Sequence, residues 1–329
     1  MEYPRRQILR LAATLAALPT LSAIASAGEY PSRRITLVVP FAPGALTDGI
    51  ARVLAEGMRP SLGQPLIVEN VTGADGTIGT GRVAHAVPDG YTLVVGVWNT
   101  HVTNAAIYPL DYDVVKDFEP IALLPDAPMV LIVKKDLPAT NLDAFIAWLK
   151  TNPDKASMGT AGVGSPPDLL ARWLRRETGA QFNMVPYRGA APAMQDVIAG
   201  QIDAMFVSFG PALPQVTSGA VKALGVTTRR RMTVAPDIPT MDESGLREFY
   251  FSYWAALFAP RGTPRDIVDK LNLAVVSTLR DPSIRQKLEA QGFEIPPVEQ
   301  QTPGALAAYQ KAEIEKWWPI VKALGPKAD

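Results

Sequence analysis

Two glycine-containing turns could bind an anion through their backbone N–H groups. The first is PFAPGALTD, residues 40–48, and the second is GTAGVGSPPD, residues 159–168. Each lies between a short apolar stretch typical of a buried strand and a stretch with helical periodicity. A helix N-terminus carries N–H groups without intrahelical partners and a partial positive charge, so it favours a carboxylate or a phosphate. An ordinary capped strand–helix turn is the alternative at each position.

The sequence also suggests how the two helices begin. Thr47 or Asp48 is expected to cap the first helix. In the second, Ser165 is the expected cap, with Pro166 at the first helical position and Asp168 reaching back to the cap. The glycines of the second turn permit positive φ angles and close approach of a ligand to the backbone. Because the two turns open helices in different halves of the chain, they could face each other across a cleft.

Other chemistries have few residues to support them. The phosphate-binding patterns G-x-x-x-x-G-K-[ST] and G-x-G-x-x-G are absent, and so is the hydrolase pattern G-x-S-x-G. There are no cysteines, and the only histidines are His85 and His101, which excludes a thiolate or multi-histidine metal site. A hydrolase using Ser165 and His101 is the rival interpretation from the enzyme class. We predict a protein with no catalytic residues, no metal and no cofactor.

Charge and composition narrow the class of partner. The 329 residues include 32 basic and 32 acidic side chains, and 47% are hydrophobic. This balance gives no positive surface for nucleic acid, and the apolar content is enough for a sizeable core. These values indicate a folded protein and give no electrostatic footprint for an anionic membrane.

The N-terminus resembles an export signal. Three arginines in the first ten residues precede an apolar stretch, and Ala25-Ser26-Ala27 has the small-residue pattern of a cleavage site. We therefore expect residues 1–27 to be a cleaved signal peptide and the product to be periplasmic. Arg5-Arg6 leaves export by the general route or by the twin-arginine route open.

The rest of the chain alternates between strands and helices. Strand patterns such as ITLVVPF, YTLVVGV and MVLIVKK are separated by segments with helical periodicity, which predicts layered α/β lobes. Three further helices are expected near the C-terminus, beginning near Thr263, Pro282 and Thr302.

Several ordered motifs resemble one family over nearly the whole mature chain. These are PSRRITLVVPFAPGALTD, LGQPLIVENVTGADGTIGTGRVAHAVPDGYTLVVG, PLDYDVVKDFEPIALL, VPYRGAAPAMQDVIAGQIDAMF, APDIPTMDESGL and FAPRGTP. The sequence resembles the solute receptors of tripartite tricarboxylate transporters, the Bug-type periplasmic receptors. The resemblance implies an α/β type II periplasmic-binding-protein fold, with lobe 1 formed by residues 28–129 and 253–329 and lobe 2 by residues 130–252.

The resemblance also implies a site and a function. In such receptors the loop after the first strand and the glycine-rich loop of the second lobe grip a ligand carboxylate, largely with backbone amides and ordered water. We expect a monomeric receptor that delivers a small organic acid to membrane permease subunits, or alternatively one that signals to a membrane partner. A transcription-regulator domain of the same fold is disfavoured by the signal sequence. The expected ligand-binding residues are Phe41, Pro43, Gly44, Ala45, Leu46, Thr47, Asp48, Trp98, Asn99, His101, Thr160, Ala161, Gly162, Gly164, Ser165, Tyr187 and Val207.

Departures from the family pattern bear on the ligand. Ala45 and Leu46 follow Gly44 where a second glycine is usual, and Val207 stands where an acid often meets a ligand amine. Together with Trp98 at an expected strand end, these residues favour an apolar or aromatic mono- or dicarboxylate over an amino acid.

Overall fold

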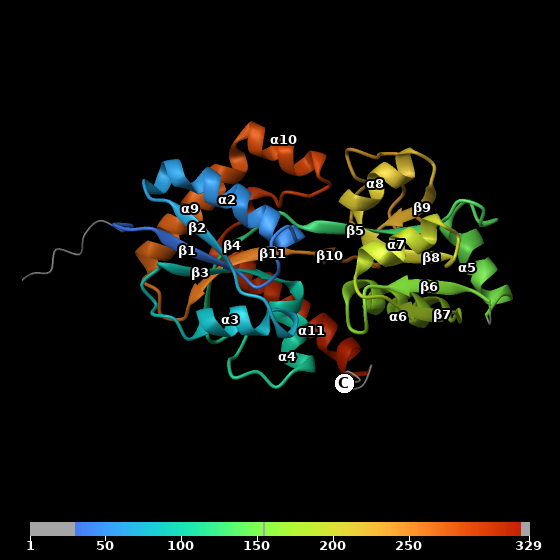
Figure 1. The fold of residues 1–329 in the computed structure, drawn as a ribbon, viewed down its shortest axis with the longest axis horizontal. Helices are drawn as coiled ribbons and strands as arrows, with labels where there is room; N and C mark the ends of the chain where they lie inside the picture. The colour runs from blue at the N-terminus through green and yellow to red at the C-terminus, as the bar shows by residue number, and fades with distance from the viewer. Residues whose placement is uncertain (1–29, 154, 324–329) are drawn as a thin grey trace, which may run out of the picture.

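The computed structural model describes residues 30–153 and 155–323, which form two α/β lobes lying side by side (Figure 1). The predicted signal peptide lies outside these residues. Within them, no helix combines the length and the apolar character needed to cross a membrane.

Lobe 1 is built on a five-stranded sheet with the order β2-β1-β3-β11-β4. Strands β1, β2 and β3 are parallel, whereas β11 runs antiparallel between β3 and β4. The strands are β1 Ile35–Val39, β2 Leu66–Asn70, β3 Thr92–Val97, β4 Phe118–Leu123 and β11 Ala255–Pro260. Alternate side chains of β1 enter different cores: Leu37 and Val39 pack in the same cluster as Leu54 and Met58 of α2, while Val38 belongs to the other cluster.

Helices cover both faces of this sheet (Figure 1). Three of them follow the last strand along the chain, as the sequence predicts. The helices of lobe 1 are α2 Leu46–Leu62, α3 Thr77–Ala84, α4 Asn104–Ile107, α9 Arg265–Arg280, α10 Pro282–Ala290 and α11 Pro303–Ala323.

Lobe 2 contains the second sheet, with the order β10-β5-β8-β6-β7 and β9 paired with β5. Its parallel part is β7-β6-β8, and β5 runs antiparallel to its neighbours. The strands are β5 Ala127–Lys134, β6 Ser157–Thr160, β7 Asn183–Pro186, β8 Ala204–Ser208, β9 Val221–Val226 and β10 Ser252–Tyr253. The helices are α5 Leu142–Thr151, α6 Pro166–Thr178, α7 Ala190–Ile198 and α8 Phe209–Thr217.

The chain passes between the two sheets twice. It leaves the first sheet after β4 and enters the second at β5, then returns from β10 to β11 with only Trp254 between them. The expected limits at 129/130 and 252/253 fall within β5 and β10, which pair with each other at the crossing.

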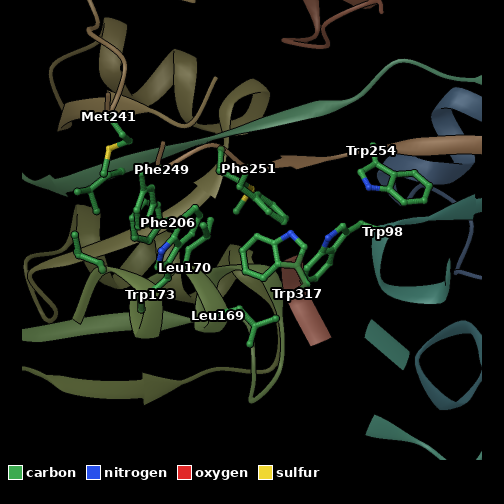
Figure 2. Packing of buried hydrophobic residues seen from close by; sticks show 14 of the residues in the cluster. Trp98, Leu169, Leu170, Trp173, Phe206, Met241, Phe249, Phe251, Trp254 and Trp317 are labelled. Carbon is green, nitrogen blue, oxygen red and sulfur yellow. The ribbon is translucent and has the colours of Figure 1, made fainter. Parts of the chain in front are cut away.

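Aromatic side chains from both lobes pack together near this crossing (Figure 2). Trp317 of α11 packs edge-on against Trp98, which follows β3, and against Trp173 of α6, with ring centroids 5.2 Å and 5.4 Å apart. Phe251 completes the group, 5.4 Å from Trp317. Helix α11 therefore contacts both lobes through one buried ring.

Candidate ligand-binding site

The two glycine turns follow corresponding strands of the two sheets. The first turn follows β1, which lies between its parallel neighbours β2 and β3, and the second follows β6, which lies between β7 and β8. In open α/β sheets, ligands bind in a crevice outside the carboxyl ends of the strands. This crevice lies where the strand order reverses, so that the chain connections run to opposite sides. The topology thus places both turns where a ligand crevice is expected.

The first turn is held by the Asp48 carboxylate. Asp48 Oδ2 accepts hydrogen bonds from Gly44 N–H at 2.9 Å and from Arg52 Nε at 2.9 Å. Asn70 Nδ2 donates to Asp48 Oδ1 at 3.0 Å and to the Phe41 carbonyl at 2.9 Å. The helix cap is Ala45, not Thr47 or Asp48 as predicted, because the Asp48 side chain bonds to Gly44 N–H, ahead of the cap.

The second turn repeats this geometry. Asp168 Oδ2 accepts from Gly164 N–H at 3.0 Å and from Arg172 Nε at 2.9 Å. The φ angles of Gly44 and Gly164 are 81° and 79°, and only residues that tolerate the left-handed region fit there without strain. Ser165 is at the cap position as predicted, but its hydroxyl donates to the Gly162 carbonyl at 2.6 Å and makes no capping bond to the helix.

The two turns differ in the donors of their first helical turn. Leu46 and Thr47 carry N–H groups at the start of α2, whereas Pro166 and Pro167 at the start of α6 have none. In the second turn, donors for an anion must therefore come from backbone N–H groups of the loop before the helix, because proline has removed two of the usual ones and the Ser165 hydroxyl donates to the Gly162 carbonyl.

A cavity of about 520 Å³ lies between the lobes, within the range of about 300–1,000 Å³ common for small-molecule sites. The loop 161–167 forms one wall, and strand ends and loops from both lobes and the crossing strands form the rest. The lining residues are Phe41, Asp75, Asn99, Met129, Ala161, Gly162, Val163, Gly164, Ser165, Pro166, Pro167, Ala190, Ser208 and Tyr253.

Six of the expected ligand-binding residues line this cavity: Phe41, Asn99, Ala161, Gly162, Gly164 and Ser165. The rest of the first turn does not, since Pro43 and Gly44 are exposed outside it and Thr47 and Asp48 are buried. Tyr187 is also off the cavity, with its hydroxyl donating to Asp196 at 2.6 Å. Expected contacts that do not line the cavity are Pro43, Gly44, Ala45, Leu46, Thr47, Asp48, Trp98, His101, Thr160, Tyr187 and Val207.

Trp98 and His101 belong to the core. Both side chains are fully buried, Trp98 against Phe251 and Trp317, and His101 stacked on Phe258 with ring centroids 4.0 Å apart. The expectation that they meet a ligand is not supported, because the chain turns inward after β3. A Ser165–His101 pair is not formed either, and burial lowers the pKa of His101 to about 3.

Val207 gives no information on the ligand. Its side chain is 2% exposed and packs with Val130 and Phe209 in a buried cluster, away from the cavity. The inferences drawn from Val207 and Trp98 about an apolar or aromatic ligand therefore lose their structural basis.

Sequence reasoning missed eight lining residues, among them Asp75, Met129, Ser208 and Tyr253. Met129 and Tyr253 lie on the two crossing strands, and their positions depend on pairing between distant parts of the chain. Ser208 ends β8 beside them. A signal for Asp75 was available: it lies in TGADG, a glycine-flanked turn next to a predicted strand.

We expect Asp48→Asn to destabilise the fold by about 1–2 kcal/mol at pH 7. The hydrogen bond from Arg52 first, and then those from Gly44 and Asn70, lower the Asp48 pKa from 3.8 to about 2. This stabilisation is complete above pH 3.8 and is lost as the pH falls through 2, so urea unfolding at pH 7 should show it. The matched control is Asp269→Asn, which removes an exposed i,i+4 pair with Arg265 and should change stability by less than about 0.5 kcal/mol. Equal midpoints for the two variants would contradict this role of Asp48.

Residues 30–153 and 155–323 contain no group of three or more histidine, aspartate or glutamate side chains placed to hold a metal ion. The cavity wall instead consists of neutral polar groups, apolar side chains and one carboxylate. Such a wall suits reversible capture of a small molecule, and a two-lobed fold with a cavity at the crossing strands defines the class of periplasmic binding proteins.

Comparison with known proteins supports the assignment to this class. MatC from Rhodopseudomonas palustris, solved with bound malate, is 40% identical over 89% of this chain and all of its own, with a TM-score of 0.75. A second Rhodopseudomonas palustris protein, solved with adipate, is 32% identical over 90% of this chain and 99% of its own, with a TM-score of 0.78. BugT of Bordetella pertussis is 36% identical over 93% of this chain and 94% of its own.

The model of the tripartite tricarboxylate transporter family receptors matches residues 50–325, and the chain belongs to this family. The predicted family and the two-lobed periplasmic-binding-protein fold are both confirmed.

Proposed function

We propose that the protein is an exported receptor that captures a small organic carboxylate between its lobes and delivers it to a membrane permease. The observation that carries this proposal is the cavity between the lobes, one wall of which is the loop of the second glycine turn. The relatives with bound malate and bound adipate support a carboxylate as the ligand class. Cleavage after Ala27, a periplasmic location and a monomeric receptor are parts of the same proposal.

The ligand carboxylate would bind to backbone N–H groups of the loop 161–165, with bridging water. Rotation about the crossing strands would then bring the first turn, with the N–H groups of Leu46 and Thr47, onto the ligand. The nearly identical geometry of the two turns supports their use as paired contacts on opposite lobes.

A thermal-shift screen tests the ligand class. The chain from Gly28 onward is heated alone and with saturating mono-, di-, tri- and aromatic carboxylates. A ligand at a hundredfold excess over its Kd should stabilise the protein by about 2.7 kcal/mol, which raises the midpoint by several degrees. If no carboxylate raises the midpoint, while amines or sugars do, the proposed ligand class is wrong.

A further inference from the structure

Asp75 lies in a turn whose backbone φ angles are unusual for residues other than glycine. Residues 73–76 all have positive φ angles, 129° for Gly73, 44° for Ala74, 54° for Asp75 and 86° for Gly76. Side chains other than glycine adopt this region rarely, and then mostly at turns, strained sites or functional sites. A carboxylate is therefore placed where the backbone alone would favour glycine.

Hydrogen bonds and close packing fix the conformation of this turn. Asn104 Nδ2 donates to the Asp75 carbonyl at 2.9 Å, and Asn99 Nδ2 reaches the same oxygen at 3.4 Å. Gly76 N–H donates to the Gly73 carbonyl at 2.9 Å. A Cβ atom at Gly76 would meet Thr100 at 2.8 Å, so this glycine allows the turn to pack closely on the lobe. Asp75 is thus held at the cavity by buried framework residues.

Asp75 brings a negatively charged side chain to the cavity wall. Asp75 is exposed and lines the cavity, and among the described lining residues it is the only one with a charged side chain. It lies in lobe 1, whereas the loop 161–167 forms the wall from lobe 2. Asp75 also affects Tyr253, another residue of the cavity wall. The pKa of Tyr253 is raised first by burial and then by the negative charge of Asp75.

We infer that Asp75 binds a cationic group of the ligand, so that the receptor selects carboxylates that also carry an amine or another positive charge. This inference rests on the proposed function. The ligand carboxylate would bind to the loop 161–165, and its ammonium group would bind to Asp75 on the opposite lobe. A dicarboxylate would bring a second negative charge toward the Asp75 carboxylate, and like-charge repulsion would disfavour it.

Calorimetry with ligands matched in carbon number tests this inference. The six-carbon probes are hexanoate, adipate, norleucine and 6-aminohexanoate, and the four-carbon probes are butyrate, succinate and 4-aminobutyrate. At least one amino acid should bind about tenfold or more tightly than the neutral and dicarboxylate probes of the same length. Asp75→Asn keeps the side-chain size and tolerates the left-handed turn, and should abolish that preference.

The matched control is Asp111→Asn, which removes an exposed carboxylate that does not line the cavity and should leave the preference unchanged. If adipate or hexanoate binds as tightly as the amino acids, or if Asp75→Asn keeps the preference, the inference is wrong while the proposed function stands. If no probe binds while another carboxylate raises the unfolding midpoint in the thermal-shift screen, the inference is wrong and the proposed function stands; if no carboxylate acts in either experiment, both are wrong. Unfolding of each variant without ligand checks that the fold is retained.

Discussion

Replacing Gly164 by valine should weaken ligand binding at least about 100-fold. Gly164 has a φ angle of 79°, which a β-branched residue adopts only with strain. A Cβ atom there would meet only Ile107, at 3.9 Å, so the strain comes from the backbone and not from a clash. The loop would relieve this strain by moving, and its donors would no longer converge on the ligand.

The matched control is Gly179→Val. Gly179 ends the same helix, α6, with a φ angle of 68° and no atom within 4 Å of an added Cβ. Both variants should lose about 1–3 kcal/mol of stability from backbone strain, but only Gly164→Val should lose affinity. Titration calorimetry measures the affinity, and urea unfolding measures the stability. Equal affinities of the two variants would exclude the second turn from the site.

The second large effect is a pH-dependent stability that comes from His101. Burial lowers the pKa of His101 to about 3, so the folded protein holds this ring neutral. Its contribution is complete above the unfolded pKa of about 6.5 and is lost as the pH falls toward 3. Between pH 7 and pH 5 the loss is about 2 kcal/mol, because about 1.5 pH units then separate the solvent from the unfolded pKa.

This effect has to be measured as a difference between variants. Burial raises the pKa of Asp126, next to the crossing strands, to about 7, so lowering the pH through 7 stabilises the fold at that position. Subtracting the pH dependence of His101→Gln from that of the original protein cancels this opposing contribution. The matched control is His85→Gln, which makes the same substitution at the only other histidine of the sequence. If His101→Gln keeps the same pH dependence, the buried ring is not its source.

The sequence was sufficient to predict the parts of the fold that depend on local patterns. Both glycine turns, 40–48 and 159–168, are recognisable in the sequence. In each, a strand pattern, glycines and a segment with helical periodicity follow one another within about 25 residues. The pattern also predicted that the two turns open helices in different halves of the chain and could face each other across a cleft.

The errors concern side chains whose surroundings are set by distant segments. Trp98 follows a strand and was expected to face a ligand, but Trp317 on the last helix encloses it together with Phe251. Asp75 was overlooked although its glycine-flanked turn is visible in the sequence, because its place at the cavity also depends on a distant segment. Its turn depends on side chains of Asn99 and Asn104 that no local pattern connects to it.

Titration calorimetry on the chain from Gly28 onward, with the carboxylates that raise its unfolding temperature, tests the central claim most directly. One carboxylate should bind saturably with one molecule per protein chain, and Gly164→Val should abolish the heat of binding while Gly179→Val retains it. Binding with several molecules per chain, or binding that survives in Gly164→Val, would contradict capture of the ligand in the cavity between the lobes.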